Sequence, residues 1–120
     1  MKMRHSVPFL ILATAISLLL PKAVLAGGGS VKILSPMDGQ TVDGSGGVEL
    51  KYNVTLSPNG GHLHVYVDHR RPIIDHDVSG CPCTLKLPDL SPGKHRVAVK
   101  EATPNHHLTG VGSTVTFNVK

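Results

Sequence analysis

The sequence predicts an all-β sandwich of antiparallel strands in a single domain. Apolar and polar residues alternate with a period of two along several short runs, which is the pattern of a strand with one wet face. Clusters of glycine, proline, serine, asparagine and aspartate separate these runs, and such clusters form turns. No run with helical periodicity follows residue 26. Short strands joined by frequent turns are typical of a sandwich.

The first three strands are expected over residues 31–34, 48–56 and 62–68. Residues 31–34 form a short, mostly apolar run that ends at the turn beginning with Ser35. In 48–56 the apolar residues occupy the even positions, and polar residues fill all of the odd ones. In 62–68 the apolar side chains move to the odd positions. Each strand therefore has one face suited to a core.

Four further strands are expected over residues 73–76, 83–87, 95–101 and 112–119. Two isoleucines after a proline mark the first, and alternating apolar residues mark the other three. Short strands at this spacing indicate an immunoglobulin-like sandwich of six to seven strands. The tryptophan and inter-sheet disulfide of antibody domains are absent. The predicted core consists of Leu50, Tyr52, Val54, Leu63, Val65, Val67, Leu85, Val97, Val99, Val115, Phe117 and Val119.

The first 26 residues read as a secretory signal peptide. Lys2 and Arg4 precede an apolar run over residues 7–20, and Ala26 offers a small residue before a cut. The run is shorter than the roughly 20 residues that a membrane-spanning helix needs. We therefore expect a signal peptide over residues 1–26, a flexible lead-in over 27–30 and the sandwich domain over 31–120. The product is periplasmic or secreted, with no membrane span after cleavage.

Charge and composition exclude some function classes. The whole chain carries 12 Lys+Arg and 8 Asp+Glu, a net charge of +4. Removal of Lys2, Arg4 and Lys22 leaves 9 against 8, so the net charge falls to +1. A nucleic-acid partner requires clustered basic residues, and none remain beyond one arginine pair. No nucleophile and base stand in a recognisable catalytic pattern, so we expect no enzyme activity.

Histidines are the most informative polar residues. His62 and His64 stand two apart on the strand over 62–68, so they project to the same face, about 6.6 Å apart at Cα. That face is opposite the apolar one and is expected to be polar. His106 and His107 lie in the loop after the strand over 95–101, at the same end of the sandwich. The four imidazoles form a candidate metal site, and Zn²⁺ or Cu²⁺ suits imidazole ligands.

Other residues near that end have open roles. A returning strand would bring Asp75, His76 and Asp77 toward the same end as further donors. Exposed histidines are also common in proteins that bind nothing, so a solvated polar face is the competing interpretation. In that case the domain is an adhesion or interaction module with a protein partner and no metal.

Two further features are predicted to be structural. Cys81 and Cys83 belong to an exported chain, so we expect a disulfide in a tight ring, with a thiolate clamp for Cu(I) as the alternative. His95 shares its parity with Val97 and Val99 and follows a turn. We expect it to tie that corner of the sandwich by a hydrogen bond.

The chain resembles a group of small exported bacterial domains of unknown function with an immunoglobulin-like sandwich. The motifs that carry the resemblance are Gly61-His-Leu-His-Val-Tyr-Val-Asp68, Leu90-Ser-Pro-Gly-Lys-His-Arg-Val97, Asn105-His-His-Leu-Thr-Gly110 and Val115-Thr-Phe-Asn-Val119. The resemblance implies the fold and export but no activity. In related domains a glycine commonly follows the Val-x-Val-Asp strand, whereas His69 stands there in this chain, so it is open whether the tight turn forms.

Periplasmic copper-resistance sandwiches are a more distant comparison. Those proteins use a histidine at the mature N-terminus, where this chain would have Gly27. Met37 is the one methionine that remains after residue 26, so the methionine-rich pattern of many copper carriers is missing. The resemblance therefore implies no specific copper site.

The signal-peptide interpretation predicts cleavage after Ala26, because the positive start, the apolar length and the small residue at the cut agree. Mass spectrometry of the protein recovered from outside the cytoplasm should give a chain that begins at Gly27. Recovery of a membrane-retained chain that begins at Met1 would contradict the prediction.

Overall fold

The computed structural model describes residues 28–120, which contain eight β-strands and no helix. The strands are β1 (Ser30–Ser35), β2 (Thr41–Val42), β3 (Glu49–Thr55), β4 (His62–Val67), β5 (Ile73–Asp75), β6 (Cys83–Lys86), β7 (Gly93–Ala102) and β8 (Leu108–Val119). The predicted signal peptide lies outside the described residues. Within them, no segment is a helix that could cross a membrane.

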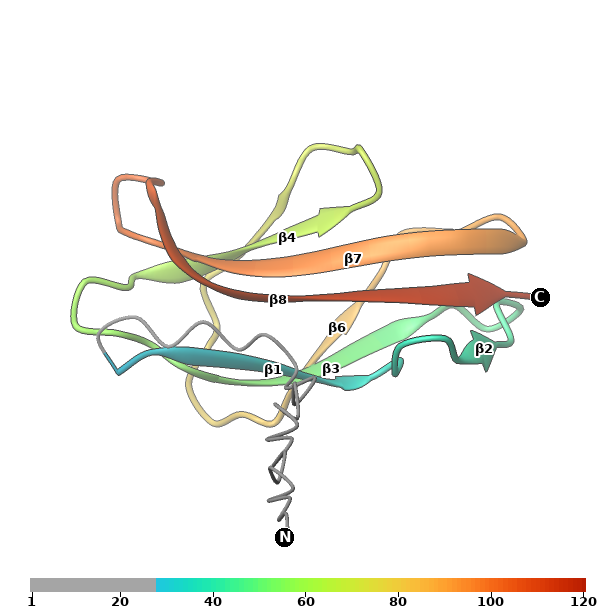
Figure 1. The fold of residues 1–120 in the computed structure, drawn as a ribbon, viewed down its shortest axis with the longest axis horizontal. Coiled ribbons are helices and arrows are strands. Elements are labelled where there is room, and N and C mark those ends of the chain that lie inside the picture. The colour runs from blue at the N-terminus through green and yellow to red at the C-terminus, as the bar shows by residue number, and fades with distance from the viewer. Residues whose placement is uncertain (1–27) are drawn as a thin grey trace, which may run out of the picture.

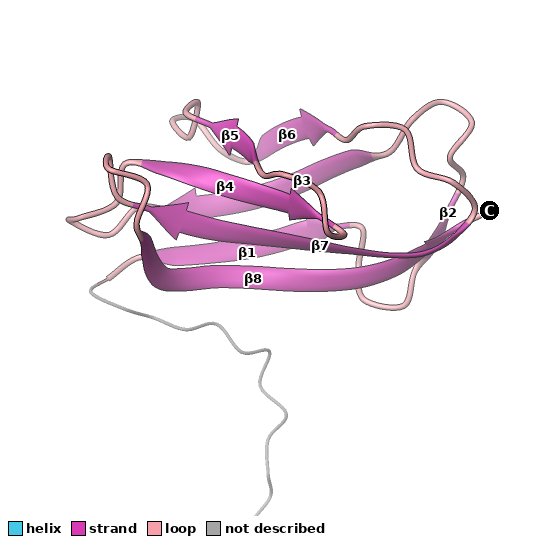
Figure 2. Ribbon diagram, turned by 90° about the horizontal axis from the view of Figure 1, so that it is seen from above, coloured by secondary structure: helices cyan, strands magenta, loops and turns pink. Residues whose placement is uncertain are grey.

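The strands form two sheets that face each other. One sheet has the order β1-β3-β6, and the other has the order β2-β8-β7-β4-β5. Figure 1 shows them as two layers, with β4, β7 and β8 in one and β1, β3 and β6 in the other. Figure 2 shows β8, β7, β4 and β5 side by side. All neighbours pair antiparallel except β2, which runs parallel to β8.

This architecture confirms the predicted immunoglobulin-like sandwich. The seven expected strands are present with small shifts at their ends, and β2 is an addition of two residues that was too short to predict. β1 begins at Ser30, and Gly29 is already buried against Ser57. The lead-in expected over residues 27–30 is therefore shorter than the sequence indicated. β8 begins at Leu108, so the loop before it is also shorter than expected.

The core lies between the two sheets where the alternation placed it. Ten of the twelve predicted core residues are buried, while Val54 and Leu85 are partly buried and pack against the others. Burying a valine or leucine side chain contributes about 1.5–3 kcal/mol, so this face drives the sandwich together. The structure adds Val31, Val48, Leu87 and Val111 to the core.

One end of the β4-β7 pair is held by a charged contact between His95 and Asp68. The His95 ring places Nδ1 2.7 Å from Asp68 Oδ2 and Nε2 2.6 Å from the Ser91 carbonyl oxygen. Both partners are acceptors, so both ring nitrogens donate and the imidazole is protonated. The Asp68 hydrogen bond is the main cause that raises the pKa of His95. The predicted structural role of His95 is confirmed.

Asp68 also explains why the turn after β4 forms without a glycine at position 69. Asp68 itself takes the left-handed conformation, with φ of 54°, which aspartate tolerates better than most residues. Its Oδ1 accepts the Arg96 N–H at 2.9 Å, and Arg70 N–H donates to the Val67 carbonyl at 3.0 Å. His69 is exposed and needs no special backbone conformation.

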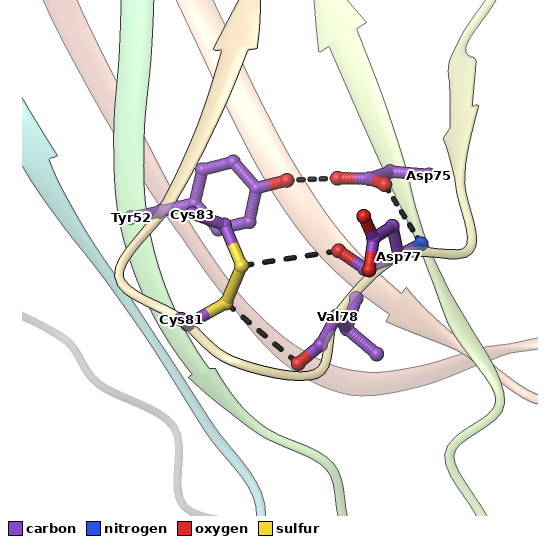
Figure 3. The surroundings of a disulfide bond; sticks show 6 residues. All are labelled: Tyr52, Asp75, Asp77, Val78, Cys81 and Cys83. Atoms are coloured by element: carbon purple, nitrogen blue, oxygen red, sulfur yellow. Dashed lines mark hydrogen bonds between the residues drawn. A yellow bond between two sulfur atoms is a disulfide. The ribbon is translucent and has the colours of Figure 1, made fainter.

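Cys81 and Cys83 form a disulfide, with Cα atoms 4.2 Å apart. This confirms the predicted pairing, and in this oxidised form neither sulfur is a thiolate ligand. Figure 3 shows the disulfide beside the segment that follows β5. There the Tyr52 hydroxyl, from the opposite sheet, donates a hydrogen bond to the Asp75 carboxylate. The two sheets are thus joined at the β5 edge.

The His95-Asp68 contact predicts a specific dependence of stability on pH. The raised His95 pKa means that its contribution is complete below the unfolded value of about 6.5 and is lost as pH rises through the folded pKa. Partial burial raises the pKa of Asp68, but hydrogen bonds from His95 and Arg96 outweigh it and lower the pKa. Its contribution is therefore complete above about pH 4 and is lost as pH falls through the lowered folded pKa.

We expect Asp68→Asn to lower the free energy of unfolding by about 1.5–3 kcal/mol near pH 6. The difference from wild type should shrink as pH rises through the folded His95 pKa. Urea unfolding at several pH values, with a chelator present, measures it. A difference that stays constant from pH 6 to 9 would contradict the charged state of His95.

Candidate metal centre

Three imidazoles converge at the start of β4. His62 Nε2 lies 3.1 Å from His64 Nε2 and 3.0 Å from His106 Nδ1, and His64 Nε2 lies 3.1 Å from His106 Nδ1. The three ring nitrogens therefore form a nearly equilateral triangle. Two of the rings belong to β4, and the third belongs to the loop between β7 and β8.

The fourth predicted ligand, His107, is not part of this cluster. Its side chain is exposed, and its backbone N–H donates to the Thr103 hydroxyl at 3.2 Å. Three donors, His62, His64 and His106, could hold one ion together. His107 does not belong to this group of three.

His76 and Asp75, both expected on the returning strand, lie on opposite faces of the sheet. His76 lies directly after β5, and its ring centroid is 4.8 Å from that of His62. The antiparallel register that pairs Leu63 with Asp75 makes His76 the cross-strand neighbour of His62 on the same face. Asp75 points to the opposite face and is engaged by Tyr52. His76 is thus a neighbour of the cluster, whereas Asp75 is a structural residue.

The expectation that His62 and His64 lie on a wet face is wrong. They do lie opposite Leu63 and Val65, but His62 is 2% exposed and His64 is 6% exposed. β4 has a neighbour on each side, β5 and β7, and the loop over residues 103–107 folds back over its outer face. Figure 1 shows this orange-to-red loop at the same end as the start of β4. Alternation alone cannot reveal a loop that covers a sheet.

A tight turn places His106 over β4. His106 N–H donates to the Thr103 carbonyl, and Thr103 N–H donates to the His107 carbonyl, each at 2.8 Å. His106 has φ of 68°, in the left-handed region that glycine and asparagine favour. On the β4 side, a Cβ on Gly61 would lie 2.9 Å from the Pro104 nitrogen. Glycine at position 61 therefore lets the loop approach β4 closely.

Hydrogen bonds cannot account for all three contacts between these nitrogens. Each ring nitrogen of a neutral imidazole is either a donor or an acceptor. Among three nitrogens in mutual contact, at least two are of the same kind, so at least one contact opposes two hydrogens or two lone pairs. Three lone pairs directed at one cation remove that conflict.

The size of the triangle suits a transition-metal ion. Metal–nitrogen distances of about 2.0–2.1 Å in a tetrahedral site separate the ligand nitrogens by about 3.3–3.4 Å. The observed separations of 3.0–3.1 Å are slightly shorter, so three such bonds require small ring movements. His64 Nδ1 lies 3.3 Å from the Tyr66 hydroxyl. An Nδ1–H donated to that oxygen leaves the Nε2 lone pair directed into the triangle.

Burial keeps His62 and His64 in the form that binds metal. Desolvation is the first cause that lowers the pKa of His62, and the neighbouring imidazoles of His106, His76 and His64 lower it further. Desolvation and His106 lower the pKa of His64 in the same way. Both rings are therefore neutral near pH 7, which is the state that ligates an ion.

Glu101 is a buried residue near this end that the sequence analysis did not single out. Its side chain is fully buried on the inner face of β7, opposite Leu63 in the register. It shares parity with the core residues Val97 and Val99, and a glutamate in a core position was the available signal. Its hydrogen bonds join segments on either side of the histidine cluster and are described further below.

The sequence matches one family model over residues 47–120, which is more than half of the chain. That model is described as a family of unknown function, DUF6130. The chain belongs to DUF6130. The predicted resemblance to domains of unknown function with this architecture is thereby confirmed at the level of family and fold. No curated protein matches the sequence.

Solved structures support the fold of this DUF6130 domain. A fibronectin(III)-like module of CbhA from Clostridium thermocellum matches with a TM-score of 0.57 and 16% identity. The match covers 75% of this chain and 95% of the module. The extracellular domain of a putative one-component system of B. thetaiotaomicron, BT4673, matches with a TM-score of 0.46 and 6% identity, over 76% of this chain and 15% of that one. At 16% identity, the CbhA module supports the fold alone. The TM-score of the second match is too low to support any conclusion.

Because His62 is buried, replacing it should cost stability even without metal. We expect His62→Ala to lower the free energy of unfolding by about 1–3 kcal/mol, since it leaves a cavity beneath the loop. His107→Ala should change it by no more than about 0.5 kcal/mol, since that ring is exposed. Chemical denaturation with a chelator present compares the two. Equal effects would place His62 outside the packed part of the sheet.

Proposed function

We propose that this DUF6130 domain binds a transition-metal ion, Zn²⁺ or Cu²⁺, through His62, His64 and His106. The observation that carries the proposal is the convergence of three ring nitrogens within 3.0–3.1 Å of one another. Hydrogen bonds leave at least one repulsive contact in such a triangle, whereas one cation can accept all three lone pairs. The ligand set is made of imidazole alone, which suits Zn²⁺ and Cu²⁺ far better than Mg²⁺ or Ca²⁺.

The strained backbone conformation of His106 supports the same proposal. A non-glycine residue in the left-handed region costs about 1–2 kcal/mol, and His106 carries that cost where glycine would be relaxed. Strained residues of this kind concentrate at functional sites. Burial of two histidines on the outer face of a sheet adds a desolvation cost. A bound ion would offset both.

The arrangement suits holding an ion more than performing a reaction with it. Three protein ligands leave one tetrahedral position for water or for a ligand from a partner. His106 is exposed, so the ion could enter and leave from the loop side. We therefore propose capture, buffering or delivery of the ion, without catalysis, in the periplasm or outside the cell. The signal-peptide pattern over residues 1–26 is the basis for that location.

His106→Ala provides the sharpest test, with His107→Ala as its matched control. Both rings are exposed and adjacent in one turn, but His106 alone of the two belongs to the cluster. An ion that binds the folded state at 100 times its Kd adds about 2.7 kcal/mol of stability. Thermal unfolding of the purified protein with Zn²⁺, Cu²⁺ or Mg²⁺ measures this gain, and calorimetry gives the Kd.

We expect Zn²⁺ or Cu²⁺ to stabilise the wild type and His107→Ala equally, and Mg²⁺ to stabilise neither. His106→Ala should weaken binding at least about 10- to 100-fold, the effect known for losing a residue that merely supports a ligand. The stabilisation should decrease as pH falls, because protons compete for the same nitrogens. No stabilisation by either ion, or equal binding by both variants, would reject the site and favour an interaction module.

A further inference from the structure

Glu101 is a carboxylate buried inside the sandwich without a cationic partner. It is fully buried, and within residues 28–120 no lysine, arginine or histidine forms an ion pair with it. Transferring an unpaired carboxylate out of water is costly unless hydrogen bonds replace the lost solvation. The structure replaces it by three donors. Burying this carboxylate costs more free energy than burying an apolar side chain, so we expect Glu101 to do more than fill the core.

The three donors come from two segments that are distant in the sequence. Ser57 N–H donates to Oε2 at 2.7 Å, and the Ser57 hydroxyl donates to Oε1 at 2.5 Å. The Thr109 hydroxyl donates to Oε1 at 2.6 Å. Burial raises the pKa of Glu101, but these hydrogen bonds outweigh it and lower the pKa. The carboxylate is therefore ionised and engaged on both oxygens.

Each of those segments leads to a ligand of the proposed metal site. Ser57 lies in the loop from β3 to β4, five residues before His62, and a Cβ on Gly60 in that loop would collide with the Glu101 carboxylate. Thr109 lies three residues after His106. On β7, the residue next to Glu101 is Ala102, which pairs with His62 in the β4-β7 register.

A bulge between β7 and β8 turns Thr109 inward. Lys100 pairs with Gly112 and Ala102 pairs with Leu108, so three β8 residues, 109–111, stand opposite Glu101 alone. Gly110 has φ of 97°, which accommodates the extra residues. The bulge therefore sets the direction in which the 103–107 loop leaves the sheet. Its position is fixed by the Thr109-Glu101 hydrogen bond.

We propose that Glu101 is the positioning residue of the metal site: from the inner face of β7 it fixes the β3-β4 loop and the β8 bulge, and so sets His106 over His62 and His64. This inference rests on the proposed metal binding for its functional meaning. In the metal-free protein, Glu101 must therefore already order the 103–107 loop before an ion arrives.

Four variants separate positioning from general stability. Glu101→Gln removes the charge and leaves too few acceptors for the three donors. Thr109→Val removes one donor at nearly constant shape, and Thr109→Ser restores the hydroxyl. Asp68→Asn is the matched control, because it weakens a charged contact of the same two strands, β4 and β7, at their opposite end.

Hydrogen exchange in the metal-free protein is the first measurement. The amides of Thr103 and His106 close the turn by hydrogen bonds, so their exchange reports its order. We expect at least about tenfold faster exchange at both in Glu101→Gln and Thr109→Val, and near wild-type rates in Thr109→Ser and Asp68→Asn. Unchanged exchange in Thr109→Val would overturn the inference, even if Glu101→Gln does not fold.

Metal titration is the second measurement, made well below the unfolding temperature of each variant. We expect Zn²⁺ or Cu²⁺ affinity to fall about 10- to 100-fold in Glu101→Gln and Thr109→Val, as for other residues that orient ligands. The Cu²⁺ electron paramagnetic resonance spectrum should change in both, and Thr109→Ser and Asp68→Asn should match wild type. Equal loss of affinity in Asp68→Asn would overturn positioning in favour of plain destabilisation. Absence of binding by wild type would reject the proposed function, while the exchange data would still decide the role of Glu101.

Discussion

The pairing of β4 with β7 is the interaction on which the rest of the structure depends. Six consecutive residue pairs, from His62-Ala102 to Val67-Val97, run between the two strands in the middle of the larger sheet. Their inner faces form much of the core, and their outer faces carry the histidines. Both ends of the pair are fixed by polar groups, the partly exposed His95-Asp68 pair at one and the buried Glu101 at the other. A shift of register by one residue would exchange the two faces and destroy both ends.

The two ends differ in how charge is satisfied. At the first, an imidazolium meets a carboxylate directly, and the pair can remain in contact with water because Asp68 is partly exposed. At the second, a carboxylate that has no ion-pair partner among residues 28–120 is held by neutral donors in a fully buried position. A hydrogen bond from a neutral donor weakens more steeply with distance and angle than the attraction between two opposite charges. The Glu101 end is therefore expected to tolerate less movement. That stiffness is what a site built from three convergent rings would need.

The fold and the site carry separate information. Fibronectin(III)-like modules share the sandwich at 16% identity, and a fold of this kind hosts many unrelated functions. The proposed function of this DUF6130 domain rests instead on local features: a His-x-His strand, a turn with a histidine in the left-handed region, and a buried glutamate. These features share one end of the sandwich.

The sequence by itself determined the strands, the inward face and the position of His95, because alternation and turn residues depend on neighbours along the chain. It also placed His62, His64 and His106 at one end, because the topology follows from strand order. It could not show that His62 and His64 are buried, that His107 lies outside the cluster, or that Glu101 accepts hydrogen bonds from both the β3-β4 loop and the β8 bulge. Those outcomes depend on where the 103–107 loop folds and on a bulge in β8, which are decided by contacts between residues far apart in the chain. The tertiary structure alone fixes such contacts, because packing and hydrogen bonding between distant segments leave no periodic trace in the sequence.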